Sequence, residues 1–143
     1  MNTVKKLLKE KGYDIWSISP DAKVFEALQL MARKDVGALL VIEKGDLVGI
    51  LSERDYARKV ALEGKSTKET TVRETMTSKV IGINPDNTVE ECMALMTDKH
   101  VRHLPVTDQD KLIGVISIGD VVKSIMTDQG IIIEQLVNCI TGR

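Results

Sequence analysis

The sequence predicts a mixed helix and strand fold of the α/β (α+β) class, built from two copies of one βαββα repeat. First, Ile15–Val60 aligns without a gap on Val80–Ile125 at an offset of 65 residues, and 15 of these 46 positions are identical. Chance would give about 3 identities at average residue frequencies. Second, apolar residues follow helical and then strand spacing in the same order in both copies. Duplication of one supersecondary unit explains both observations.

Length and composition narrow the class of protein. The chain has 143 residues, of which 43% are hydrophobic and 29% charged, with a net charge of −1, an ordinary globular composition. Its basic residues are scattered, without the concentrated positive field that nucleic acids require. Its apolar runs reach only about five residues, whereas a membrane helix needs roughly twenty. We therefore expect neither nucleic acid nor membrane as a partner.

The cysteines and the first residues bear on localisation. No apolar segment of a secretory signal follows Met1. The two cysteines, Cys92 and Cys139, form no C-x-x-C pair and no disulfide framework. Both features lead us to expect a reducing, cytoplasmic location.

The first half of each copy is predicted to be a short strand, a turn and a helix. The strands are Ile15–Ile18 and Val80–Ile83, each followed by a Ser-Pro-Asp or Asn-Pro-Asp turn. Each helix has one apolar face, formed by Val24, Ala27, Leu28 and Met31 in the first copy and by Val89, Cys92, Met93 and Met96 in the second. Cys92 is therefore expected to be a small buried residue. Thr88 and Glu91 form a predicted capping box, which the first copy lacks.

The second half of each copy is predicted to be a β-hairpin and a second helix. The hairpin strands are Ala38–Ile42 with Leu47–Leu51, and Leu104–Thr107 with Leu112–Ile116; the helices are 53–62 and 118–126, and 72–76 is a short helical turn. We therefore expect an N-terminal helical segment over 1–13, repeats over 14–62 and 80–126, a linker over 63–79 and a helical tail over 127–143. One repeat alone is too small to cover its own sheet. We expect the two repeats to pack through their sheets with pseudo-twofold symmetry, so that a cleft between them occurs twice.

Each copy carries an S-x-x-D string, Ser52–Asp55 and Ser117–Asp120, where a strand ends and a helix begins. One interpretation is structural, because Ser at the N-cap and Asp three residues later form a capping box. The other is functional. A helix N-terminus suits a phosphate, a Ser hydroxyl donates to it, and an Asp carboxylate accepts from two ribose hydroxyls. The two interpretations are compatible.

The copies differ in charge around these strings. Arg102 and His103 precede a strand in the second copy, where the first has Gly37 and Ala38. Arg is the usual residue for bidentate phosphate contacts, although a solvent-exposed strand entry explains the pair equally well. In contrast, the chain carries no G-x-S-x-G, P-loop or G-x-G-x-x-G motif and no metal-ligand spacing. We therefore expect no enzyme activity, no catalytic cofactor and no metal.

These motifs resemble the CBS domain, named for cystathionine β-synthase, over residues 14–126. The resemblance lies in Ser19–Ala27, in Gly49–Asp55 and Gly114–Asp120, and in Val101–Val106. The segment Ser52–Val60, followed by Val72–Thr77, looks like the stand-alone prokaryotic members, which carry a tandem pair of such repeats. The resemblance implies a pair that binds adenosyl ligands, namely AMP, ADP, ATP, NAD or S-adenosylmethionine, in the clefts between the repeats.

The resemblance also implies two nucleotide sites, with Asp on the ribose and Ser on the phosphate. One site would combine Ser52, Arg54 and Asp55 with Val80, Ile81, Arg102 and His103. The other would combine Ser117, Gly119 and Asp120 with Ile15, Trp16, Val36, Gly37 and Ala38. Because the second set holds no cation, we expect the first to be the better phosphate site.

The sequence thus predicts a cytoplasmic sensor that binds an adenine nucleotide and regulates an unknown protein partner in trans. The resemblance further implies a homodimer formed through helices such as Tyr56–Ala61 and Val121–Met126. The apolar stripe of the tail, Ile131–Ile140, is expected to pack on the module or across the dimer. The alternative function is a ligand-free scaffold for dimerisation or protein interaction, in which the S-x-x-D strings are only helix caps.

Overall fold

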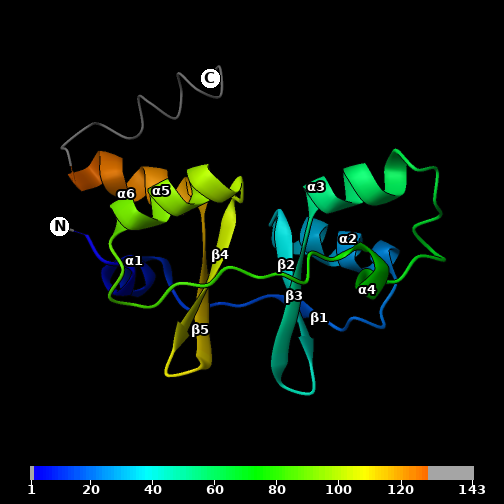
Figure 1. Cartoon of the computed structure of the whole chain (residues 1–143), viewed down its shortest axis with the longest axis horizontal. Coiled ribbons are helices and arrows are strands. Elements are labelled where there is room, and N and C mark those ends of the chain that lie inside the picture. Colours follow the sequence, from blue (N-terminus) through cyan, green and yellow to red (C-terminus); the bar gives the residue numbers. More distant parts are fainter. Residues whose placement is uncertain (1, 129–143) are drawn as a thin grey trace. The chain divides into compact units, whose positions relative to one another are not determined.

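The computed structural model of this chain describes residues 2–128, and residues 1 and 129–143, including the predicted tail, lie outside them. The chain forms two compact units. The central unit is Ile15–Ile81, a continuous stretch. The split unit joins Met1–Asp14 to Gly82–Arg143, so it carries both the blue N-terminal helix and the yellow hairpin of Figure 1. Each unit is mixed helix and strand, as predicted.

The central unit contains a small sheet with helices at one end and along one side (Figure 1). Its elements are β1 (Ser17–Ile18), α2 (Val24–Lys34), β2 (Ala38–Glu43), β3 (Asp46–Ser52), α3 (Glu53–Tyr56), the π-helical turn η1 (Ala57–Ala61) and α4 (Val72–Thr75). Among the described residues the sheet order is β1-β2-β3, with β1 parallel and β3 antiparallel to β2. The second helix predicted for this copy is therefore present, but its latter half is a π-helix.

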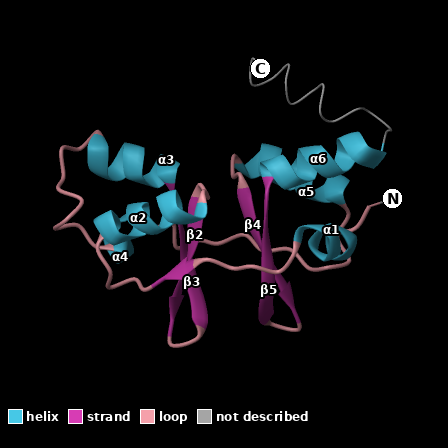
Figure 2. Ribbon diagram, turned by 180° about the vertical axis from the view of Figure 1, so that it is seen from behind, coloured by secondary structure: helices cyan, strands magenta, loops and turns pink. Residues whose placement is uncertain are grey.

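The split unit repeats this arrangement around a second hairpin, with α5 and α6 side by side at its helical end (Figures 1 and 2). Its elements are α1 (Val4–Lys11), α5 (Val89–Lys99), β4 (His103–Asp108), β5 (Lys111–Ser117) and α6 (Ile118–Asp128). The amphipathic N-terminal segment is α1, and its residues Val4, Leu7 and Leu8 are buried.

The strand predicted over 80–83 does not form. Within the described residues, only Ile83 pairs there, through an isolated parallel bridge to Val106. In the central unit the Leu40 N–H donates to the Trp16 carbonyl at 3.1 Å and holds β1 on β2. Pro105 stands at the position equivalent to Leu40 and has no N–H to donate. The second copy therefore lacks the hydrogen bond that starts this strand in the first.

Both hairpins close with the same two-residue turn. Lys44 and Gly45 have positive φ in one hairpin, and Gln109 and Asp110 have positive φ in the other. Positive φ at both central residues defines the type I′ turn, whose twist matches that of antiparallel strands. The two predicted hairpins are confirmed, with the same pairing register and a bulge after Val41 and after Val106.

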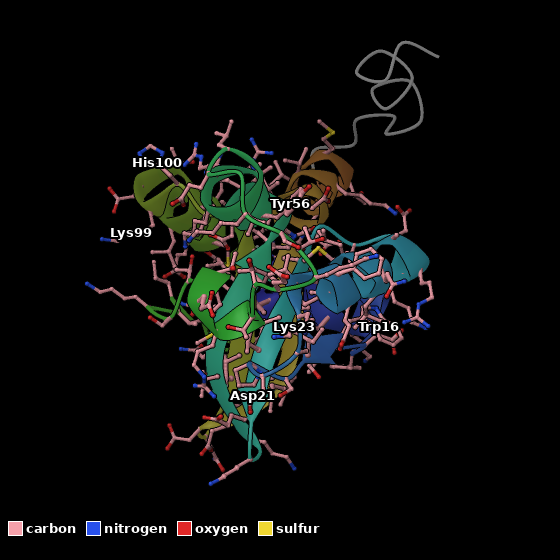
Figure 3. The ribbon with its side chains drawn as sticks, turned by 90° about the vertical axis from the view of Figure 1, so that its right-hand side faces the viewer. Trp16, Asp21, Lys23, Tyr56, Lys99 and His100 are labelled. Carbon is pink, nitrogen blue, oxygen red and sulfur yellow. The ribbon has the colours of Figure 1, made fainter. Side chains whose placement is uncertain are left out.

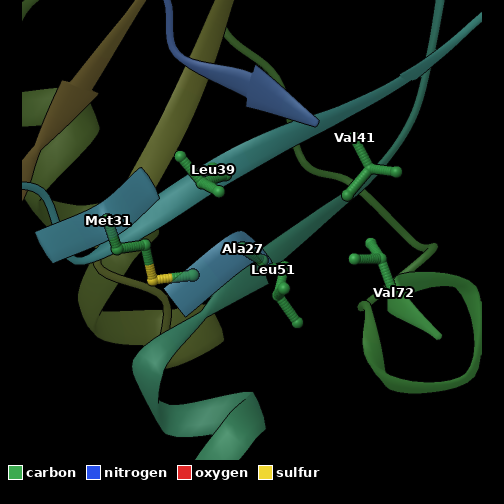
Figure 4. Packing of buried hydrophobic residues seen from close by; sticks show 6 residues of the cluster. All are labelled: Ala27, Met31, Leu39, Val41, Leu51 and Val72. Carbon is green, nitrogen blue, oxygen red and sulfur yellow. The ribbon is translucent and has the colours of Figure 1, made fainter. Parts of the chain in front are cut away.

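Each unit buries an apolar core between its sheet and its helices. In the central unit the core residues come from α2, β2, β3 and α4: Ala27, Met31, Leu39, Val41, Leu51 and Val72 (Figure 4). In the split unit the buried face of α5 includes Cys92, which is fully buried as predicted. Burial raises the pKa of the Cys92 thiol to about 11, with a smaller contribution from Glu91 and Glu90. Cys92 is therefore a packing residue without thiolate character.

A short helix from outside the ungapped repeat completes each unit. The Val72 N–H of α4 donates to the Ala22 carbonyl at 2.8 Å, and the Val4 N–H of α1 donates to the Asn87 carbonyl at 2.9 Å. The next N–H groups, of Arg73 and Lys5, donate to the carbonyls of the turn prolines Pro20 and Pro85. Between the two units, the residues that accept these hydrogen bonds are 65 residues apart, as in the repeat, whereas the residues that donate them are 68 apart. Thus α1 occupies on the split unit the place that α4 occupies on the central unit.

Candidate functional site

The first S-x-x-D string forms a complete capping box where β3 passes into α3. The Asp55 N–H donates to Ser52 Oγ at 3.1 Å, and the Ser52 N–H donates back to Asp55 Oδ2 at 3.0 Å. The Ser52 hydroxyl also donates to Asp55 Oδ2 at 3.0 Å. The structural interpretation of this string is therefore correct, and the Asp55 side chain, 13% exposed, is held in one orientation.

The other carboxylate oxygen of Asp55 has two further partners. The Thr77 hydroxyl donates to Asp55 Oδ1 at 3.1 Å, and the Lys59 ammonium lies 3.2 Å from the same oxygen. Lys59 also donates to the Thr75 carbonyl at 3.1 Å. The segment after α4 therefore contacts the string directly, and the site contains a cation besides Arg54.

The second string has the same geometry in the split unit. The Ser117 N–H donates to Asp120 Oδ2 at 2.8 Å, and the Asp120 N–H donates to Ser117 Oγ at 3.2 Å. Its partner from the completing helix is Lys11, whose ammonium lies 2.7 Å from Asp120 Oδ2. Burial alone would raise the pKa of the Asp120 carboxyl, but hydrogen bonds from Lys11 and the Ser117 N–H outweigh it and hold this pKa below its usual value. Asp120 is therefore a paired carboxylate.

The two predicted basic residues of the second copy lie beside its own S-x-x-D string. His103 pairs with Ser117 across the β4–β5 ladder, and the Ile118 N–H donates to the Arg102 carbonyl at 2.9 Å. Gly37 and Ala38 occupy the same places on the central unit, where the Glu53 N–H donates to the Gly37 carbonyl at 3.0 Å. The Arg102 backbone therefore lies beside the Ser117–Asp120 string, which also binds the Lys11 ammonium, so the expectation that this second site holds no cation is wrong.

The uncharged residues predicted for the two sites outside the strings lie in both units, and part of their backbone is already engaged. The Trp16 carbonyl accepts from β2, and the Trp16 ring, labelled in Figure 3, has the Lys34 ammonium 4.3 Å from its centroid. Val36 packs against the central core, and its N–H donates to Met31. Ile15, Val80 and Ile81 are half-buried. The grouping of each string with residues of the other repeat stays a prediction.

His103 carries a pH prediction. Burial lowers the pKa of its imidazole, and the positive charges of Lys11 and Arg102 lower it further, against the attraction of Asp120. The unfolded chain therefore binds a proton near pH 6.5 that the native His103 resists, so this residue should reduce stability as the pH falls below that value. We expect urea midpoints measured between pH 7 and pH 5 to fall less in a His103→Gln variant than in the native chain. Equal pH slopes in the two proteins would contradict this assignment.

Sequence reasoning missed three contacts of the carboxylates: Lys11, Lys59 and Thr77. Lys59 was detectable, because it follows Asp55 by four residues on a predicted helix. Lys11 and Thr77 lie outside the 46 aligned positions. The sequence signal for the segments that contain Lys11 and Thr77 was weak: Thr3-Val4 matches Thr71-Val72, but at an offset of 68 residues and not 65.

The described residues hold neither a cluster of metal ligands nor a membrane-spanning helix. Among residues 2–128, no three His, Cys, Asp or Glu side chains gather as ligands for a metal ion. In the same part of the chain, no helix has the length and apolarity needed to cross a membrane. The expectations of no metal and no catalytic cofactor stay predictions.

The repeated hairpin, its completing helices and the two strings together characterise one family. The family model for the CBS domain matches the chain twice, over residues 4–62 and 72–127. The chain belongs to the CBS-domain family. Both matches begin within the completing helices α1 and α4, so the CBS model includes the segments that supply Lys11 and Thr77.

Relatives and solved structures support this membership. The CBS domain-containing protein CBSX3 of Arabidopsis thaliana, a mitochondrial protein, is 39% identical over 87% of this chain, which spans 65% of that relative's length. The crystal structure of the CBS domain NE2398 is 52% identical, covers 87% of this chain and 98% of its own, and has a TM-score of 0.84. A CBS-domain protein from Burkholderia ambifaria MC40-6 is 50% identical over 90% of this chain and 96% of its own, with a TM-score of 0.87. The predicted fold class and the tandem CBS pair are therefore confirmed.

Proposed function

We propose that this CBS pair binds an adenine nucleotide, of the AMP, ADP, ATP or NAD class, and regulates a protein partner in trans. The observation that carries the proposal is the pair of matching S-x-x-D sites. Each places a Ser hydroxyl, an oriented Asp carboxylate and a Lys ammonium together where a strand ends and a helix begins. A site with both a strong acceptor and a cation suits a ligand that has hydroxyls at one end and phosphate at the other.

The chemistry of binding follows from this arrangement. The side chains of Asp55 and Asp120 are 13% and 24% exposed, and ribose hydroxyls would bind their carboxylates beside or in place of Lys59 and Lys11. Ser52 and Ser117 would donate to phosphate, supported in the split unit by the N-terminal dipole of α6. Arg54 on one string and Arg102 near the other would add charge-assisted contacts. The remaining predicted residues, Ile15, Trp16, Val36, Gly37, Ala38, Val80, Ile81, His103 and Gly119, would complete the two sites.

One solved structure shows what this fold can hold. The CBS domain pair of MJ0100, in complex with 5′-methylthioadenosine and S-adenosyl-L-methionine, has a TM-score of 0.78 over 90% of this chain. It is only 22% identical to this chain, so the likeness concerns the fold and not the ligand-contacting residues. It supports an adenosyl compound as the class of ligand to test first.

The proposed regulatory module acts as a homodimer in the cytoplasm. The helices predicted for dimerisation keep apolar side chains available: Leu62, next to η1, is 82% exposed, and Ile118 of α6 is 36% exposed. Val60 and Val121, predicted for the same faces, are fully buried, so the contact would use the rest of these helices.

A thermal-shift experiment tests the proposed binding. The protein is melted alone and with millimolar AMP, ATP, NAD or S-adenosylmethionine. A ligand at about a hundred times its Kd should stabilise the fold by roughly 2.7 kcal/mol. Asp55→Ala and Asp120→Ala should each reduce this ligand-dependent gain, because each removes the acceptor for one ribose. Asp46→Ala, which removes an exposed carboxylate of the β2–β3 turn, is the matched control and should keep the full gain.

The same variants separate the proposal from the scaffold alternative. If the strings are only caps, each Asp→Ala should lower stability by about 1 kcal/mol equally with and without ligand. Absence of any shift with all four adenosyl compounds would refute the proposed function.

A further inference from the structure

The ammonium group of Lys11 holds two acceptors of the split unit at once. It donates to the Val115 carbonyl of β5 at 2.6 Å and lies 2.7 Å from Asp120 Oδ2. Lys11 is the last residue of α1, and its side chain is only 33% exposed. A charge-assisted contact of this length, partly shielded from water, restricts the carboxylate more than a surface ion pair does.

In the central unit an uncharged residue after α4, Thr77, reaches the two equivalent acceptors, and the cation on Asp55, Lys59, comes from η1 instead. There the Thr77 N–H donates to the Ile50 carbonyl at 2.9 Å, and the Thr77 hydroxyl donates to Asp55 Oδ1 at 3.1 Å. Ile50 and Asp55 are the repeat equivalents of Val115 and Asp120. One Lys ammonium thus replaces one backbone N–H and one hydroxyl. The replacement is possible because α1 runs for eight residues and α4 for four, which brings Lys11 to this place.

The Lys11 contact, at 2.7 Å, determines what a ligand must do at Asp120. The hydroxyls of a ribose must compete with Lys11 for the carboxylate. An uncharged nucleoside that displaces the ammonium leaves it without an anion in a partly buried place, which is unfavourable. A ligand with a phosphate offers the displaced ammonium a new anionic partner, and the positive charge of Arg102 acts on His103, which pairs with Ser117 of the same string.

We propose that Lys11 makes the Asp120 site selective for adenosyl ligands that carry a phosphate over uncharged adenosyl compounds. The inference rests on the proposed function and adds a specificity-determining residue to it. Lys11 acts at this site in two ways: it weakens the binding of a ribose alone and strengthens the binding of a phosphate.

Calorimetric titration of variants that retain only the Asp120 site tests the inference. In an Asp55→Asn background, AMP and adenosine are each titrated into the protein with Lys11, with Lys11→Met and with Lys11→Gln. Loss of one charge-assisted contact changes affinity by about tenfold or more. We therefore expect both substitutions to lower the AMP-to-adenosine affinity ratio at least tenfold, with adenosine binding tighter and AMP weaker. Lys9→Met removes an exposed charge two residues away on α1 and should leave the ratio unchanged.

The outcomes separate this inference from the proposed function. A ratio that stays the same in both Lys11 variants, while AMP still binds, overturns the role of Lys11 and leaves the nucleotide module in place. The role of Lys11 is also overturned if the native chain binds AMP but the Asp55→Asn variant does not, because Asp120 then holds no ligand. If the native chain binds neither compound, nor ATP, NAD or S-adenosylmethionine, the proposed function fails and the inference fails with it.

Discussion

Replacement of Leu8 by alanine should lower the free energy of unfolding by about 2–5 kcal/mol, the usual loss for a large apolar side chain truncated in a core. Leu8 is 1% exposed and packs against the β4–β5 hairpin at Gly114, where an added Cβ would lie 2.9 Å from Leu8 Cδ2. Val4 and Leu7 bury the same face of α1. Although α1 precedes the first aligned repeat, its burial therefore stabilises the unit built from the second.

Urea unfolding measures this loss, and Lys9→Ala on the exposed face of α1 is the control. That control should change stability by no more than about 0.5 kcal/mol, as is usual for surface substitutions. A loss below about 1 kcal/mol for Leu8→Ala would show that α1 is not part of the core. Titration of the same variant with AMP gives a second readout, because a displaced α1 would also displace Lys11 from Asp120.

Substitution of Gly49 by alanine should cost about 1–3 kcal/mol, the range for overpacking a core. A Cβ on Gly49 would lie 2.6 Å from Met76 Sδ and 3.0 Å from the Thr77 carbonyl oxygen. The Met76 side chain can move, but the Thr77 backbone is paired in both directions with Ile50 and cannot move freely. Because Thr77 also donates to Asp55, the substitution should disturb the first S-x-x-D site as well.

Gly114→Ala is the matched comparison in the split unit. The nearest atoms to its Cβ all belong to the Leu8 side chain, so adjustment of one leucine relieves the contact. We expect a smaller loss than at Gly49, and a favourable coupling when Gly114→Ala is combined with Leu8→Ala in a double-mutant cycle. Equal losses at the two glycines would contradict the role given to the Thr77 backbone.

The parts of the fold that the sequence predicted are those with strong local signals. Three such features are present: the buried helical face of Cys92 and Met96, the two hairpins, and the capping box of Thr88. Each follows from residues that are close together in the sequence. The S-x-x-D geometry was predicted for the same reason, because the capping partners are only three residues apart.

The features that the sequence did not predict depend on residues far apart in the chain. Lys11 reaches Asp120 across more than a hundred positions, and no spacing rule connects them. The three-residue difference between the two offsets kept α1 and α4 out of the ungapped alignment. The strand predicted over 80–83 does not form because Pro105 of β4 has no N–H to donate to it. Pro105 is compatible with its own strand, so its effect appears only when the neighbouring segment is known.

The split of one unit across the chain has a consequence for synthesis. The central unit is one continuous stretch, so its strands and helices leave the ribosome in succession and can fold as soon as Ile81 has emerged. In contrast, α1 emerges before the central unit, and β5, which carries its partner Gly114, begins only at Lys111. At about 5–20 residues per second, the apolar face of α1 waits on the order of ten seconds for the strands that cover it. A nascent chain of this protein therefore completes its central unit while the apolar face of α1 still lacks the strands that cover it.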